Sequence, residues 1–164
     1  MNLSRLILLF PVFLVALSCT NNDAQSEFEQ KAYSQPEGIT QTDQNGSIVG
    51  DEDPDDWRTS PFYAGLAEIE PAFPNPLLYS ETASLEVFLN GTPFTSILEL
   101  GYFDFQDRWT QIDLEQDISE FSVSSLTIDP QFFGSNASLA RGTYRLIVFD
   151  GNQRVITYGD ITIE

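Results

Sequence analysis

The sequence contains no histidine and only one cysteine among its 164 residues. Without histidine the chain lacks the commonest general base, the commonest zinc or copper ligand and the side chain that ordinarily titrates near neutral pH. A single cysteine excludes an internal disulfide, so a folded core or bound ions must supply the stability. These absences remove most catalytic designs, and we expect a protein that is not an enzyme.

Positive charge is also scarce. Seven Lys and Arg stand against 25 Asp and Glu, which gives a formal net charge of −18. Such a field repels phosphate backbones, so we expect no nucleic-acid partner. Aromatic residues, by contrast, make up 13% of the chain, including 13 Phe, which is enough for a hydrophobic core. The length predicts one domain with additional segments.

The N-terminus has the pattern of a secretory signal. Arg5 precedes an apolar stretch at residues 6–17 that is too short to span a bilayer comfortably. The stretch ends in Ala16-Leu17-Ser18-Cys19, which resembles the lipobox of bacterial lipoproteins. The alternative is an ordinary signal peptide that happens to end near a cysteine.

The lipobox resemblance implies that residues 1–18 are removed and that the thiol of Cys19 carries diacylglycerol, with an acylated amino terminus. Two or three acyl chains bury dozens of methylenes at about 0.8 kcal/mol each, so attachment would be effectively permanent. Because Thr20 follows the cysteine where inner-membrane lipoproteins carry Asp, the resemblance implies the outer membrane of a diderm bacterium, on its periplasmic or its surface side. Apart from this covalent lipid, no cofactor is expected.

Residues 19–56 are predicted to be a disordered acidic tether. They are rich in polar side chains, and isolated apolar residues such as Phe28, Tyr33 and Ile39 follow no helical or alternating period. Ten acidic residues stand against one Lys, so the segment should repel itself and extend to an r.m.s. reach on the order of 35 Å.

The tether ends in the acidic cluster DEDPDDW at residues 51–57. Asp51, Asp53 and Asp55 stand at alternate positions, as oxygen ligands do in calcium loops, and are weak candidates for a calcium site. The EF-hand pattern fails because its sixth position is not Gly and its twelfth is not Glu. The alternative is a solvated boundary followed by Trp57 docking onto the domain.

Residues 57–164 are predicted to form an all-β domain, a single immunoglobulin-like β-sandwich of about seven strands. Runs rich in Val, Ile, Phe, Tyr and Thr alternate with Gly, Pro, Asn and Asp, and no window has a helical period. The expected strands are residues 66–71, 84–90, 96–105, 109–114, 120–128, 143–150 and 154–163.

Apolar residues alternate along these strands. One strand places three of them on the same face, namely Leu85, Val87 and Leu89. Residues 144–148 repeat the arrangement, with Arg145 expected to face outward. Residues 150–153, Asp-Gly-Asn-Gln, predict a hairpin turn between the last two strands, and Gly159 predicts a bulge or bend.

Two stretches carry a family resemblance. LARGTYRL at 139–146, followed by VFDG, resembles the L-x-x-G-x-Y pattern at the start of a strand in fibronectin-type and immunoglobulin-like sandwiches. It implies that Tyr144 forms a tyrosine corner. PAFPNP at 71–76 resembles the opening of type IX secretion sorting domains, which share the L-x-x-G-x-Y pattern. Pro74-Asn75-Pro76 is read either as a rigid turn or as part of a secretion signal.

Catalytic candidates are limited to carboxylate pairs. Asp104 with Asp107, or Asp113 with Glu115, could in principle act as they do in glycosidases, but such pairs occur in any acidic protein. The serines at 122–125 have no His or Lys nearby that could activate a nucleophile.

A binding surface is better supported than a catalytic one. Four aromatic residues fall within eight positions, and two more follow Asp129-Pro130; the six candidates are Tyr102, Phe103, Phe105, Trp109, Phe132 and Phe133. One strand-turn-strand unit cannot easily hide so much aromatic surface, although alternation of core and polar residues is the competing interpretation. The sequence thus predicts an outer-membrane lipoprotein whose sandwich binds another envelope protein or complex. The alternatives are a type IX sorting-like module and a calcium-dependent or carbohydrate-binding module.

Overall fold

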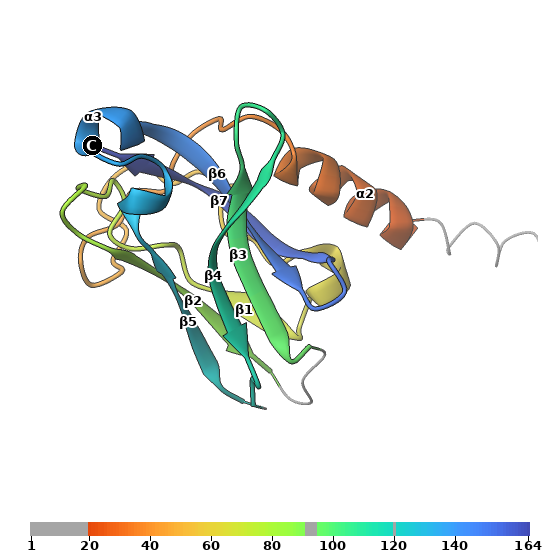
Figure 1. Cartoon of the computed structure of the whole chain (residues 1–164). Helices are drawn as coiled ribbons and strands as arrows, with labels where there is room; N and C mark the ends of the chain where they lie inside the picture. The colour runs from red at the N-terminus through yellow and green to blue at the C-terminus, as the bar shows by residue number, and fades with distance from the viewer. Residues whose placement is uncertain (1–19, 91–94, 120) are drawn as a thin grey trace, which may run out of the picture.

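The structure is a computed structural model that describes residues 20–90, 95–119 and 121–164. Within these residues, seven strands form two antiparallel sheets that pack face to face (Figure 1). One sheet has the order β1-β2-β5, and the other has the order β4-β3-β6-β7. The prediction of an all-β sandwich of about seven strands is confirmed, whereas the signal segment 1–18 and Cys19 lie outside the described residues.

The strand bounds agree with the predicted runs. The strands are β1 (Ala67–Ile69), β2 (Ala83–Leu89), β3 (Ile97–Phe103), β4 (Trp109–Gln116), β5 (Val123–Ile128), β6 (Gly142–Asp150) and β7 (Val155–Ile163). Short helices connect or precede them, namely α2 (Thr20–Ala32), η2 (Pro61–Tyr63), η3 (Pro130–Phe132) and α3 (Ala137–Ala140). No helix in the described part of the chain is long and apolar enough to cross a membrane.

The core lies between the two sheets and follows the predicted alternation. Along β2, every second side chain is buried, and the same period holds in β5. These residues face apolar side chains of β3 and β6, so each sheet turns one face inward. The fully buried aliphatic residues of this layer include Leu85, Val87, Leu98, Leu100, Leu126, Ile128, Leu146 and Val148.

Two predicted local features are confirmed. The hydroxyl of Tyr144 donates to the backbone oxygen of Ala140 at 2.9 Å, which is the contact of a tyrosine corner. β6 and β7 form a hairpin in which the Asp150 amide donates to the carbonyl of Arg154 at 3.0 Å. The turn between them is held by the Asp150 carboxylate, which accepts from the Arg154 amide at 2.8 Å.

The prediction for Gly159 is wrong. Gly159 pairs with Leu146 in regular register, and the register shift in this hairpin lies between Val148 and Phe149. A Cβ built on Gly159 would come within 2.3 Å of the Trp57 indole. Glycine is therefore required because a buried ring lies flat on the strand backbone, not because the strand bends. The expectation that Trp57 docks onto the domain is confirmed, since its side chain is buried there.

The structure also differs from the disordered tether expected at residues 19–56. Residues 20–56, which we call the arm, begin with helix α2 and continue as an irregular segment that packs on the four-stranded sheet (Figure 1). Asp23 in the first turn and Lys31 in the last turn suit the helix dipole. Phe28 and Ala32, four residues apart, are buried in a second hydrophobic cluster with residues of β6 and β7.

Polar groups hold the rest of the arm. Arg145 lies on the outward side of β6, as expected, but the arm covers it and leaves it 8% exposed. Its guanidinium forms two hydrogen bonds, at 2.7 and 2.8 Å, with the fully buried carboxylate of Asp160 and donates to the backbone oxygen of Lys31 at 2.7 Å. Asp56 accepts from the amides of Thr40 at 2.7 Å and Asp160 at 2.8 Å. The composition of the arm predicted disorder because the arm has few apolar residues of its own. The groups that order it lie elsewhere in the chain, on β6 and β7 and at Ala72 and Asn75.

Candidate binding groove

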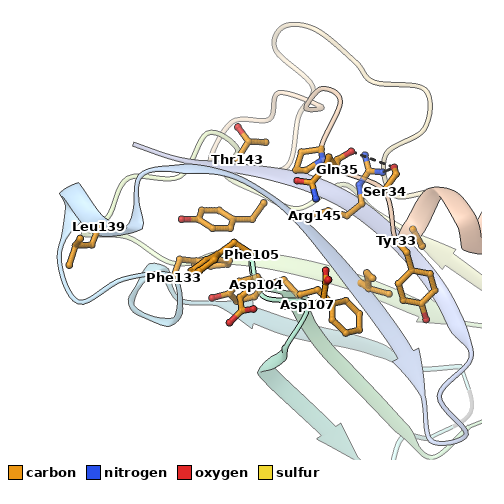
Figure 2. Close-up of a pocket in the computed structure, with 16 residues that line it drawn as sticks. Tyr33, Ser34, Gln35, Asp104, Phe105, Asp107, Phe133, Leu139, Thr143 and Arg145 are labelled. Carbon is orange, nitrogen blue, oxygen red and sulfur yellow. Dashed lines mark hydrogen bonds between the residues drawn. The ribbon is translucent and has the colours of Figure 1, made fainter.

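A groove of about 600 Å³ opens at one end of the sandwich. Its walls come from residues 32–36 of the arm, the β3–β4 loop at 104–107, Phe133, Leu139 of α3, and residues 143–145 of β6. Figure 2 shows Leu139 and Tyr33 at opposite ends, with Phe105 and Phe133 between them. We call this the aromatic groove; its aromatic lining is Tyr33, Tyr102, Phe103, Phe105, Phe133 and Tyr144.

The β3–β4 loop is a rigid turn. One carboxylate oxygen of Asp104 accepts from the amides of Gln106 at 2.8 Å and Arg108 at 3.0 Å. The other oxygen forms an ion pair with the Arg108 guanidinium at 2.7 Å, and this side-chain bond lowers the pKa of Asp104. At the tip, Phe105 is 92% exposed. Because these bonds already order the loop, a ligand that packs on the ring of Phe105 would cost the loop little further conformational entropy.

The floor of the groove is a packed aromatic cluster. Tyr102 is almost buried, and its hydroxyl donates to the backbone oxygen of Phe132 at 3.1 Å. Its ring centroid lies 4.7 Å from that of Phe133, which lies 4.4 Å from that of Tyr144. Because Tyr144 is itself fixed by its bond to Ala140, the floor is preorganised.

The arm supplies the opposite wall. The ring of Tyr33 lies 5.7 Å from that of Phe103, which lies 5.1 Å from the ring of Trp109. The indole N–H of Trp109 donates to Glu99 at 2.7 Å. A Cβ on Gly101 would come within 2.6 Å of this indole, so glycine at that position lets the ring lie on β3. Trp109 therefore supports the wall from behind.

The six aromatic candidates from the sequence separate into three groups. Phe103 and Phe105 line the groove with exposed rings, while Tyr102 and Phe133 line it from the packed floor. Trp109 lies behind Phe103, and Phe132 is exposed next to the groove but does not line it. For Tyr102 the competing core interpretation therefore applies as well.

Sequence reasoning missed two exposed groove residues, Tyr33 and Leu139. The composition places Tyr33 in the predicted tether, and Leu139 has a role in the sequence only as part of the L-x-x-G-x-Y pattern. Phe28 and Ala32, which stand four residues apart just before Tyr33, are spaced as on one face of a helix and could have predicted that this segment docks. Nothing in the sequence showed that this helix ends beside Phe103.

The acidic cluster at 51–57 is engaged by other side chains. Asp55 forms ion pairs with Lys31 at 2.7 Å and Arg58 at 2.8 Å, and the bond to Lys31 lowers its pKa. Asp53 accepts from the amide of Asp55 at 2.9 Å, whereas Asp51 is exposed. Across residues 20–90, 95–119 and 121–164, no group of three acidic or thiol side chains is arranged to hold a metal ion.

One carboxylate of each predicted pair, Asp104 and Asp113, has a structural partner. Asp104 is occupied by the turn and by Arg108. Asp113 on β4 accepts from the amide of Thr127 on β5 at 2.7 Å, which joins the edges of the two sheets. This bond gives an exposed edge amide of β5 a partner.

Pro74-Asn75-Pro76 lies where the arm meets β7. The Asn75 side chain is buried, donates to the backbone oxygens of Thr40 and Asp160 at 3.0 Å each, and accepts from the amide of Thr162 at 3.1 Å. The peptide bonds before both prolines are cis.

In comparisons with known proteins, no family model and no curated sequence matches this chain.

Proposed function

We propose that this chain is a bacterial lipoprotein, anchored to the outer membrane through Cys19, whose β-sandwich is a non-catalytic binding module of the cell envelope. The observation that carries the binding role is Phe105, whose ring is 92% exposed on a rigid turn beside a preorganised aromatic floor. An exposed large apolar patch of this kind is typical of an interaction site. The partner would be another envelope protein or a larger envelope complex.

The arm supports this arrangement. The structure describes helix α2 from Thr20, the residue after Cys19, and these 13 residues span about 20 Å. A lipid on Cys19 would therefore be joined to the sandwich by a docked helix instead of a long tether. The lining of the aromatic groove includes Ala32, the last residue of this helix, so the anchor and the groove would lie at opposite ends of α2.

The proposal of a non-catalytic role rests on which ionisable residues the chain has and on how the groove holds Asp104. There is no histidine to act as a general base near neutral pH. In the groove, Asp104 is held ionised by Arg108, so it is unsuited to act as a general acid. A type IX sorting-like role is a weaker candidate because Asn75, the centre of the Pro-Asn-Pro motif, is buried and its side chain is occupied by hydrogen bonds.

Metabolic labelling with palmitate tests the anchor. We expect the wild-type chain to incorporate label and Cys19→Ser to lose it, because the serine hydroxyl cannot replace the thiol in diacylglycerol transfer. Label retained in Cys19→Ser would contradict the anchor.

Photo-crosslinking in the native host tests the groove. A benzophenone amino acid replaces Phe105 in the full-length chain, and the matched control replaces Phe121, which is 70% exposed beyond the other end of β4. We expect ultraviolet light to produce one discrete adduct at position 105 and none at 121. Equal adducts at both positions, or none at 105, would contradict a binding role for the groove.

A further inference from the structure

The charges around the aromatic groove are unbalanced. Two carboxylates, Asp104 and Asp107, and one guanidinium, Arg145, line it. Arg145 is already bonded twice to Asp160, and Asp104 is paired with Arg108. Asp107 is exposed and forms no ion pair within the described residues. The groove therefore offers an occupant one free negative charge and no free positive charge.

The exposed side chains that line the groove together with Asp107 are mostly apolar. Phe105 at 92% and Leu139 at 63% exposure have no polar atom in their side chains. Phe103 is also partly exposed, and the exposed tyrosine of the groove lining, Tyr33, adds a ring with a hydroxyl. Such a lining suits a ligand with apolar side chains. A sugar suits it less well, because each sugar hydroxyl needs a hydrogen-bond partner when it is buried and these side chains offer few.

We propose that the aromatic groove binds an extended peptide segment of a partner protein in which an apolar side chain stands next to a Lys or Arg. The apolar side chain packs on Phe105, and the cation pairs with Asp107. The chain's net charge of −18 adds long-range attraction for such a segment. This inference rests on the proposed binding function and specifies the chemistry of its ligand.

A peptide library displayed on phage tests the ligand class. The full-length lipoprotein in lipid nanodiscs is the target, and empty nanodiscs remove peptides that bind lipid. We expect the enriched peptides to share a Lys or Arg next to a large apolar residue. One such peptide is then synthesised and its Kd is measured against the wild type and the variants, at 50 and 500 mM NaCl.

The variants separate the two contacts. Phe105→Ala should weaken binding about 10- to 100-fold, as loss of an interface hot spot does. Asp107→Asn should weaken it about 3- to 10-fold and reduce its salt dependence, because the cation loses its partner. Phe121→Ala, the exposed control at the far end of β4, should leave the Kd unchanged.

Three outcomes would overturn the inference. Enriched peptides could lack a cation, or could bind Phe105→Ala as tightly as the wild type. Alternatively, an oligosaccharide array could bind in a Phe105-dependent way while no peptide does, which would assign the groove to carbohydrate. If position 105 still crosslinks a partner in cells, any of these outcomes rejects the ligand class and leaves the binding function standing; absence of that crosslink rejects the binding function itself.

Discussion

The arm and the sandwich are stabilised by different kinds of contact. The sandwich core is a continuous layer of apolar side chains from both sheets. The main apolar contact of the arm is that of Phe28 and Ala32 of α2, which pack on β6 and β7, and the ring of Tyr33 adds a contact with Phe103. Beyond the helix, it is held by buried polar groups, chiefly Arg145, Asp160 and Asp56.

This difference explains how each part responds to change. Apolar contacts between sheets are numerous and non-directional, so the loss of one leaves many others. A buried ion pair is directional, and removal of one partner leaves an uncompensated charge in the interior. We therefore expect single polar substitutions to release the arm while the sandwich remains folded.

The largest effect is expected for Arg145→Ala. It leaves the fully buried carboxylate of Asp160 without its guanidinium partner and should lower the free energy of unfolding by about 3–5 kcal/mol. Urea unfolding measures the loss. The matched control is Arg108→Ala, which removes an ion pair on an exposed turn and should change the free energy of unfolding little. Equal losses of stability in the two variants would contradict a stabilising role of the buried Arg145–Asp160 ion pair.

Phe28→Ala should have the next largest effect. It removes the main apolar contact of α2 and should cost about 2–4 kcal/mol, below the top of the range for core Phe because the site lies beneath a single helix. Hydrogen exchange should become fast in residues 23–32 while β2 and β6 keep their protection. Phe105→Ala is the control and should change the stability little, since that ring is exposed. Loss of protection in β2 would show that the arm and the sandwich unfold together.

Gly159→Ala tests the junction between the two regions. The added methyl would overlap the Trp57 indole and should cost about 1–3 kcal/mol by overpacking. Tryptophan emission should shift to longer wavelength as Trp57 moves toward solvent. Gly151→Ala is the matched control, because a Cβ there meets its nearest atom, on Ile97, at an ordinary 3.5 Å. An unchanged spectrum in Gly159→Ala would rule out the close approach.

The smallest expected effect is a pH dependence of arm docking through Asp56. The pKa of Asp56 is raised to about 7, chiefly by burial and also by the nearby carboxylates of Asp160 and Asp53, while hydrogen bonds from two backbone amides oppose the rise. Arg145, paired with Asp160, is the cation that faces this site. Because the folded state binds the proton more tightly than the unfolded state, this contribution is fully present below about pH 4 and is lost as the pH rises through about 7.

Urea unfolding followed by tryptophan emission measures this dependence. Between pH 5 and pH 9 we expect a loss on the order of 1–2 kcal/mol, reduced from the full linkage value because the group is not completely buried. Asp56→Asn should flatten the profile, since an amide does not titrate in this range. A wild-type profile that stays flat from pH 5 to pH 9 would show that Asp56 is ionised throughout this range.

The sequence predicted the sandwich well because its information is local. Alternation in β2 and β6, the turn after Asp150 and the pattern ending in Tyr144 each lie within a few residues. The groove was predicted only in part: Phe103 and Phe105 follow from local composition, whereas Tyr33 does not. Its place depends on where α2 ends after docking, and that contact joins residues 70 positions apart, Tyr33 and Phe103.

What the sequence by itself determined is the strand pattern, the tyrosine corner and the prediction of a lipid anchor at Cys19, since each depends on neighbouring residues. Only the tertiary structure decided that the acidic segment after Cys19 is an ordered arm, that this arm covers the side chain of Arg145, and that the arm and the β3–β4 loop enclose the aromatic groove. The physical reason is distance along the chain. The bond from Arg145 to Lys31 spans 114 positions and that from Asp160 to Asp56 spans 104, so the partners that order these polar groups cannot be read from their surroundings in sequence.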